Sequence, residues 1–468
     1  MLEFIVNYTL VIYVLIIIAI GFFVGRKVKS AADFFIAGHN LNSGLLFTTL
    51  IAANLGAGST VGVTALAYKY GVSAWWWIGS AGIGSLILAF IVGPRIWKIS
   101  REHDLFTLSD YLEMRYNKFF SSLISFMMTF GTLALFSSQL LGIAWILDTV
   151  AGIPKFYGVL TGAIVTTLYF AAGGLLSSAF VNIVEVAVIL AGFLISVPYL
   201  LYSTGGIENI SARINNASYF DFGGMGLTAI IGYLIMLVPS FFVSPGLIGK
   251  IFGAKDVRAI KIGTALNGLV QLFFAAIPVF IGIVAFAYFP DLSNADLALP
   301  VIMKNMLPFY ISSLALAAIF AAEVSTADTV LYMLAGALTN DIYKKFLNPN
   351  ISDKNFLRAS RVTSIICGVL GILLALKLES IISALTIFYS LMSVSLTAPL
   401  IFGLFTKKAN SNGAILSAIL GVALTLYITF FKNGVIDFGF IKLNATTCGI
   451  IFSFVIMFFA MLFTKSKD

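Results

Sequence analysis

Apolar stretches of roughly 20 residues recur along the whole chain and are joined by short polar segments. As an α-helix, each stretch is long enough to cross a hydrocarbon core of about 30 Å. Only 10% of the 468 residues are charged, whereas soluble globular chains carry about 25%. Runs such as residues 11–23 are apolar on every face, unlike the alternating strands of a membrane β-barrel. The sequence therefore predicts an all-α polytopic membrane protein.

The segmentation predicts thirteen membrane spans, near residues 4–25, 42–68, 73–98, 119–151, 156–172, 178–203, 226–249, 259–289, 311–338, 359–376, 380–405, 412–431 and 445–464. The net charge of +8 does not come from one patch, so nucleic acid is not expected as a partner. With the amino terminus outside, three quarters of the 28 basic residues fall in inside loops. Because cytoplasmic loops are enriched in Lys and Arg, we expect a multi-pass protein of the inner (plasma) membrane with a cytoplasmic carboxyl terminus.

Two of the predicted spans are interrupted. The second contains the sequence NLGAGST at residues 54–60, and the seventh contains PSFFVSPG at residues 239–246. Glycine in a membrane helix also allows close helix packing, which is the alternative interpretation of either break alone. Two breaks in corresponding halves indicate an inverted-repeat transporter whose site lies near the bilayer midplane.

The ninth predicted span carries the densest group of oxygen-bearing side chains. Ser325 and Thr326 lie one turn after Ala322 and one turn before Asp328 and Thr329. Sodium is coordinated by several oxygens, and carbonyls freed at a helix break can supply some of them. The hydroxyls could instead satisfy their own helix or join helices. An acidic residue inside a span usually faces a partner or a water-filled cavity, so we favour a cation site.

Other polar residues in or beside the spans have less specific roles. Asn182 and Glu185 lie one turn apart and should share an interior groove, whereas Glu323 points away from Asp328 and could form a packing or gating hydrogen bond. Asp341 is expected to be a solvated charge at a helix end. The tryptophans at residues 75–77 are expected to be interfacial anchors, and one of their rings could roof a pocket.

Reactive groups are few. Cys367 and Cys448 lie inside apolar segments, and His39 and His103 are the only histidines. These counts favour neither a disulfide framework nor a histidine-based metal site. No nucleophile, metal cluster or cofactor motif stands out, so the chain is predicted not to be an enzyme and to need no cofactor apart from a coupling ion.

At residues 52–59 (AANLGAGS), 322–329 (AEVSTADT) and 341–344 (DIYK), the chain resembles the sodium:solute symporter family. The resemblance runs from residues 34–38 to residues 403–405. It implies a LeuT-like fold in a single transporter domain, residues 1–468. An extra first helix (4–25) would precede two inverted five-helix repeats (42–203 and 226–405), and two helices (412–464) would follow.

The resemblance also implies site residues. The family's common sodium site falls on Ala52, Leu55, Ala322, Ser325 and Thr326. A second cation site, found in some members, would use Ser325, Asp328, Thr329 and a sixth-span aspartate that is Asn182 here. The substrate positions that the resemblance implies are Asn54, Ser59, Trp77, Ser240, Phe241 and Ser244.

The pattern is nearest to the family's choline-transporter branch, but Asn54 and Ser244 stand where that branch has tryptophans, so choline is not transferred as the substrate. Residues 245–250 (PGLIGK) also depart from the family's Gln-x-x-x-Gln-Arg. The implied function is sodium-coupled symport of a small organic solute by alternating access. The alternative is a membrane-embedded solute or ion sensor on the same fold. No Arg or Lys lies in the two breaks, which favours a neutral, zwitterionic or cationic solute.

Overall fold

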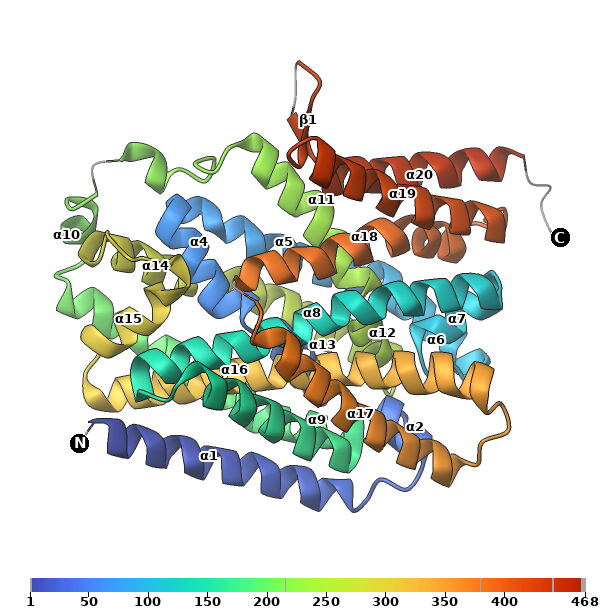
Figure 1. The fold of residues 1–468 in the computed structure, drawn as a ribbon, viewed down its shortest axis with the longest axis horizontal. Helices are drawn as coiled ribbons and strands as arrows, with labels where there is room; N and C mark the ends of the chain where they lie inside the picture. The colour runs from blue at the N-terminus through green and yellow to red at the C-terminus, as the bar shows by residue number, and fades with distance from the viewer. Residues whose placement is uncertain (1, 215, 379, 440–441, 464–468) are drawn as a thin grey trace.

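The computed structural model describes residues 2–214, 216–378, 380–439 and 442–463. Its helices run side by side as one bundle, with α1 along one edge and α19 and α20 along the opposite edge (Figure 1). The strands in the described part of the chain are two, β1 (Val435–Asp437) and β2 (Lys442–Asn444), which pair antiparallel between α19 and α20. The prediction of a mainly helical, polytopic fold is therefore confirmed.

The first half of the chain forms helical elements joined by short turns. They are α1 (Leu2–Gly25), α2 (Ala31–Ile36), η1 (Ala37–His39), α3 (Ser43–Asn54), η2 (Gly58–Gly62), α4 (Val63–Tyr70), η3 (Gly71–Ala74), α5 (Trp75–Ile87), η4 (Leu88–Val92), α6 (Gly93–Glu102), α7 (Leu108–Arg115), α8 (Lys118–Ala151), α9 (Lys155–Ser203), α10 (Ile207–Ser211) and η5 (Ala217–Phe220).

The second half continues in the same way. Its elements are α11 (Leu227–Val243), α12 (Pro245–Phe252), α13 (Val257–Phe274), α14 (Ala276–Tyr288), η6 (Ala295–Leu297), α15 (Ala298–Asn305), α16 (Phe309–Ala335), η7 (Gly336–Leu347), α17 (Asp353–Ala375), α18 (Ile381–Phe405), α19 (Ser411–Phe431) and α20 (Ala445–Leu462).

Ten helical stretches of the described residues are long and apolar enough to cross a membrane. Two of them, Gly58–Glu102 and Lys155–Ser203, contain 45 and 49 residues, more than twice the roughly 20 residues of one crossing. The second of these turns at Gly174, where φ is 53° and ψ is −141°. A Cβ atom there would lie 2.5 Å from the carbonyl oxygen of Phe34, so both the conformation and the space require glycine. The turn falls between two predicted spans, 156–172 and 178–203.

The outer surface of the bundle is apolar. Large side chains such as Leu15, Phe126 and Phe430 are more than half exposed and lie on long helices. Soluble monomers rarely expose apolar surface on this scale, whereas hydrocarbon tails solvate it well. The chain is a multi-pass membrane protein.

The helix α16 lies at the centre of the packing, and almost all of its residues are buried. Small residues fill it, including the run Ala317–Ala318 and the run Ala321–Ala322. Small side chains let neighbouring helices approach closely in a membrane protein. The polar side chains of α16 consequently meet groups from α3, α9 and α12 in the interior.

Candidate functional site

The first half of the site is the break after α3, which Gly56 makes possible. A Cβ atom on Gly56 would lie 2.4 Å from Thr326 Oγ1 and 2.5 Å from Gln139 Oε1, so any other residue would displace these side chains of α16 and α8. The next residue, Ala57, donates its N–H to Gln139 Oε1 at 2.8 Å. In a continuous helix that N–H would bond to the carbonyl of Ala53. The break therefore frees backbone oxygen at the end of α3.

Two hydroxyls of α16 meet the freed carbonyls. Ser325 Oγ lies 2.9 Å from the carbonyl oxygen of Ala52 and 3.0 Å from that of Ala322. Thr326 Oγ1 lies 3.1 Å from the Ala52 oxygen and 3.3 Å from the Ala53 oxygen. We call the oxygens of Ala52, Ala53, Ala322, Ser325 and Thr326 the carbonyl–hydroxyl cluster. It is a buried group of uncharged oxygens of the kind that binds a hard cation.

Four of the five residues that the resemblance implied for sodium thus come together in the carbonyl–hydroxyl cluster. The fifth, Leu55, is buried directly after α3 and donates its N–H to Ile51. Within the described chain, no hydrogen bond joins Leu55 to Ser325 or Thr326. Ala53 contributes an oxygen that the sequence interpretation did not include. Ala53 lies between Ala52 and Leu55 in the sequence, so the helix break was the feature that could have identified it.

The second half of the site is the break between α11 and α12. Ser244 has φ −56° and ψ 122°, which are not helical values, and its Oγ accepts a hydrogen bond from the N–H of Leu247 at 3.5 Å. Pro245 is the first residue of α12, where the missing N–H costs no helical bond. On α11, Ser240 Oγ lies 2.6 Å from Ser393 Oγ of α18. The sequence PSFFVSPG therefore ends one helix and begins the next, as predicted.

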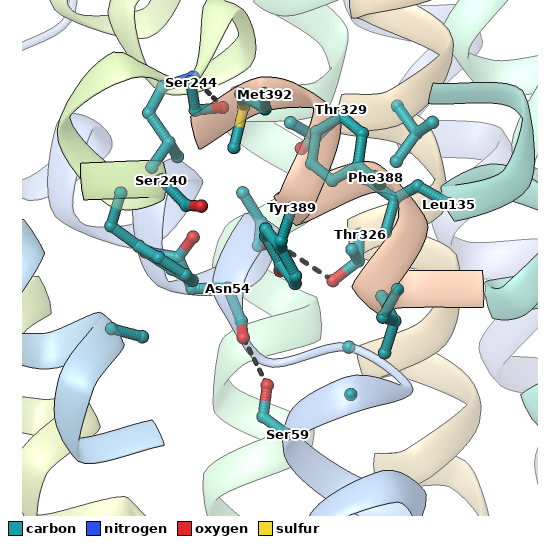
Figure 2. A pocket seen from close by; sticks show the side chains of 18 of the residues that line it. Asn54, Ser59, Leu135, Ser240, Ser244, Thr326, Thr329, Phe388, Tyr389 and Met392 are labelled. Carbon is teal, nitrogen blue, oxygen red and sulfur yellow. Dashed lines mark hydrogen bonds between the residues drawn. The ribbon is translucent and has the colours of Figure 1, made fainter. Parts of the chain in front are cut away.

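A small cavity lies between the two breaks (Figure 2). All six positions implied for the substrate line it, namely Asn54, Ser59, Trp77, Ser240, Phe241 and Ser244. In Figure 2, Asn54 and Ser59 lie on one broken segment and Ser240 and Ser244 on the other. The structure therefore brings together residues that are almost 200 positions apart in the sequence.

Aromatic rings form one side of this cavity. The Tyr389 ring of α18 stacks on Phe241 with centroids 6.0 Å apart and meets Trp77 edge-on at 6.1 Å. Phe388, beside Tyr389, also lines the cavity. The sequence interpretation missed both α18 residues, because that span has no break and an apolar run does not show which face meets a cavity.

Amide side chains form another side. Gln139 of α8 and Gln271 of α13 line the cavity, and Asn54 Nδ2 donates to Asn267 Oδ1 at 3.0 Å. Gln139 and Gln271 were also missed, although a polar amide inside a membrane span is itself an indication of an interior role. The residues described as lining the cavity include no Asp, Glu, Lys or Arg.

One of the candidate second-cation residues, Thr329, contacts a buried lysine. Lys250 Nζ donates to the carbonyl oxygen of Thr49 at 2.6 Å and to Thr329 Oγ1 at 2.8 Å. Asn182 Nδ2 donates to Thr49 Oγ1 at 3.0 Å. Asp328 is buried and accepts a hydrogen bond from the Tyr169 hydroxyl at 2.9 Å. Asn182 and Lys250, a basic residue that follows the second break, therefore both bond to Thr49 in the interior of the bundle.

The remaining acidic positions are also buried. Glu323 has no exposed surface and its Oε1 accepts a hydrogen bond from Thr60 at 3.0 Å, which agrees with a packing role on the face away from Asp328. The expectation of a solvated Asp341 is wrong. Asp341 is buried and accepts hydrogen bonds from Thr107 at 3.1 Å and Ser125 at 2.8 Å, because α7 and α8 cover this end of η7.

The fold has a close structural counterpart. A Na⁺-coupled sialic acid symporter, solved in a substrate-bound outward-open state, aligns with a TM-score of 0.86 at 18% sequence identity. The alignment covers 100% of this chain and 99% of the symporter. The fold and the cavity between two broken helices define the class of the protein, a polytopic membrane protein of the LeuT-like fold.

Sequence comparison identifies the family. The model of the sodium:solute symporter family matches residues 34–421. The sodium/glucose cotransporter of Vibrio parahaemolyticus is 26% identical, over 100% of this chain and 92% of that protein. The sodium/pantothenate symporter of Escherichia coli (strain K12) is 27% identical, over 89% and 88%. The chain belongs to the sodium:solute symporter family. It is a sodium-coupled symporter of a small organic solute, and not an enzyme.

Proposed function

We propose that the cavity between the two breaks binds the transported solute and that the carbonyl–hydroxyl cluster binds the coupling sodium ion. The observation that carries this proposal is that Thr326 belongs to both the carbonyl–hydroxyl cluster and the cavity lining. Its hydroxyl contacts the oxygens of Ala52 and Ala53, and the residue also lines the cavity. A cation and a solute bound there would share one wall, so either would organise part of the other's site.

The sodium ligands proposed are the oxygens of Ala52, Leu55, Ala322, Ser325 and Thr326, joined by that of Ala53. Sodium prefers oxygen ligands, and carbonyls at an unwound helix are well suited to it. The Leu55 carbonyl belongs to the same break.

The solute proposed is a small organic molecule that carries no net negative charge. An anionic group would normally be met by Arg or Lys, and the described lining of the cavity offers amides, hydroxyls and aromatic rings in their place. Asn54, Ser59, Gln139 and Gln271 supply hydrogen-bonding groups. The faces of Trp77, Phe241 and Tyr389 suit an apolar or cationic part of the solute.

We further propose thirteen spans, made of one helix, two inverted five-helix repeats and two more helices, with the amino terminus outside and the carboxyl terminus in the cytoplasm. The start of α1 and the end of α20 lie at opposite ends of the bundle (Figure 1), which requires an odd number of crossings. The breaks after α3 and α11 support matched repeats. The distribution of basic residues supports the orientation.

In the proposed alternating-access cycle, sodium and solute bind to the same open state of the transporter. Linkage requires that sodium and solute raise each other's affinity by the same factor. The decisive experiment is a thermal-stability screen of small metabolites with the purified full chain, in sodium and in potassium. A true solute should raise the melting temperature more in sodium. Equal stabilisation in both salts, together with sodium-independent uptake into proteoliposomes, would contradict the proposed sodium site.

A further inference from the structure

Glu323 of α16 is a buried acidic residue that belongs neither to the carbonyl–hydroxyl cluster nor to the described lining of the cavity. The ion pairs of the described chain do not include it. An ionisable side chain inside a membrane span is costly, so it usually has a specific partner and a function. The partner here is Thr60 of η2, whose hydroxyl lies 3.0 Å from Glu323 Oε1. This contact joins α16 to the segment just beyond the first break.

The helix α16 therefore holds the break at both of its ends. Before the break, Thr326 contacts the carbonyl oxygens of Ala52 and Ala53. After the break, Glu323 contacts Thr60. Thr326 and Glu323 are three residues apart, almost one helical turn, so they project from the same side of α16. The broken segment thus has two separate attachments to one helix, and only the first belongs to the proposed sodium site.

A glycine of α8 makes room for the second attachment. A Cβ atom on Gly142 would lie 3.0 Å from both the carboxyl carbon and Oε2 of Glu323, and 3.1 Å from the Cβ atom of Ala57. Three residues before Gly142, Gln139 accepts the N–H of Ala57 at 2.8 Å. The helix α8 thus closes over the carboxyl group beside the break, and this close packing limits where Glu323 and Thr60 can move.

The second attachment lies directly behind the solute cavity. Thr60 follows Ser59, which lines the cavity, whereas Thr60 is not among the described lining residues. The hydroxyl of Ser59 donates to the carbonyl of Asn54, at the end of α3. Adjacent residues of η2 therefore face in different directions, Ser59 toward the cavity and Thr60 toward Glu323. A displacement of Thr60 would consequently move the cavity wall at Ser59.

We propose that Glu323 is a positioning residue that transmits the effect of sodium to the solute cavity. Sodium acts on the end of α3, before the break. Glu323 anchors Thr60 beyond the break, so a change at the first attachment reaches Ser59 and is not absorbed by free movement of η2. The inference rests on the proposed functions of the cavity and of the carbonyl–hydroxyl cluster. It adds the residue through which the two sites affect each other.

The first test follows Ser59 with a thiol reagent and needs no known solute. Cys367→Ala with Cys448→Ala removes the two natural thiols, and Ser59→Cys places one in the cavity wall. The probe is 2-(trimethylammonium)ethyl methanethiosulfonate. Its reaction rate should differ at least about fivefold between sodium and potassium, the lower end of typical coupling between two sites.

Variants of Glu323 in this background carry the test. Glu323→Ala should remove the sodium effect on the reaction rate. Glu323→Gln should keep it, because the amide oxygen can still accept the hydrogen bond from Thr60. The matched control is Ser313→Ala, a buried residue of α16 whose hydroxyl bonds within its own helix, to the carbonyl of Phe309. It should keep the sodium effect as well.

Melting temperatures of the same variants separate this proposal from the sodium site. Glu323→Ala should still be stabilised by sodium, because the carbonyl–hydroxyl cluster is intact. A sodium effect on the Ser59→Cys reaction that is the same with and without Glu323 would overturn the proposal. If sodium does not stabilise the unaltered chain, the sodium site is contradicted instead, and the second test decides on Glu323.

The second test is a double-mutant cycle on the Ser59→Cys reaction rate, in N-methylglucamine and without sodium. Glu323→Ala and Thr60→Val should each change the rate, and the two together should change it no more than either alone. Additive effects would overturn the proposal, because the two residues would then act independently. If Glu323→Ala does not fold, Thr60→Val decides alone. It should lose the sodium effect of the first test, and a retained effect would overturn the proposal.

Discussion

The hydroxyl oxygen of Thr326 on α16 lies 3.1 Å from the carbonyl oxygen of Ala52, at the end of α3. This contact joins the most buried helix of the bundle to the break that borders the solute cavity. A movement of one broken segment relative to α16 would therefore change the cation site and the cavity together. Such a shared element is what coupling between two ligands requires.

The variant Ser325→Ala with Thr326→Ala should lose its response to sodium. Both side-chain oxygens of the carbonyl–hydroxyl cluster disappear, while the small residues keep the helix packed. At a sodium concentration 100 times the dissociation constant, the stabilisation lost would be about 2.7 kcal/mol. Thermal unfolding in sodium and in potassium measures it. The matched control is Ser312→Ala with Ser313→Ala, another buried pair on α16, which should keep the sodium response.

The variant Gly56→Ala should reduce both stability and sodium-dependent uptake. Its methyl group would overlap Thr326 Oγ1 and Gln139 Oε1, so the break must move away from α16. Overpacking of this kind typically costs about 1–3 kcal/mol. The control is Gly44→Ala in α3, the helix that precedes the break, where the nearest atom would be 3.5 Å away. A Gly56→Ala protein with unaltered uptake would show that the close approach is not needed.

The variant Tyr389→Leu should weaken solute binding more than it weakens sodium binding. The ring contacts Phe241 and Trp77 at the aromatic side of the cavity. The loss of one aromatic contact of about 1.4 kcal/mol corresponds to a tenfold rise in KM. Uptake kinetics at saturating sodium test this. Tyr310→Leu, at an exposed position on α16, should leave KM unchanged, and a similar rise there would contradict the assignment.

His39 should make the protein less stable in acid. It lies between α2 and α3, outside the membrane spans, and its Nδ1 is 2.8 Å from the carbonyl oxygen of Phe252. Burial lowers the pKa of His39 below its ordinary value of 6.5. The unfolded chain therefore takes up this proton first as the pH falls, and stability decreases below about pH 6.5.

The variant His39→Gln should accordingly flatten the decline of the melting temperature between neutral pH and about pH 5. Glutamine can still donate a hydrogen bond to the Phe252 carbonyl, so the loop should remain closed. A decline as steep as in the unaltered chain would assign the acid sensitivity to other groups.

The sequence could predict the features that are local in the chain. The hydroxyls of Ser325 and Thr326 and the two Gly- or Pro-containing breaks are each contained within a few residues. A membrane environment restricts what such residues can do, because unsatisfied polar groups are costly there. The two breaks therefore allowed the position of the cavity to be predicted from the sequence.

The features that depend on distant partners could not be predicted. Asp341 follows an apolar span and precedes two lysines, so it resembles a helix-end charge, but Thr107 and Ser125 cover it from elsewhere in the chain. Tyr389 lies in an uninterrupted apolar span and reaches the cavity only through the packing of α18. The partners of Lys250 come from three other helices, and no local pattern relates them.

The uncharged lining of the solute cavity has a consequence for how far the transporter can concentrate its solute. When a solute without net charge moves with one sodium ion, each cycle carries one positive charge. A membrane potential of 100 mV supplies about 2.3 kcal/mol per charge, and a tenfold sodium gradient adds about 1.4 kcal/mol. The combined force would support roughly a five-hundred-fold accumulation of the solute. Collapse of the membrane potential should therefore lower the steady-state accumulation by more than collapse of such a sodium gradient.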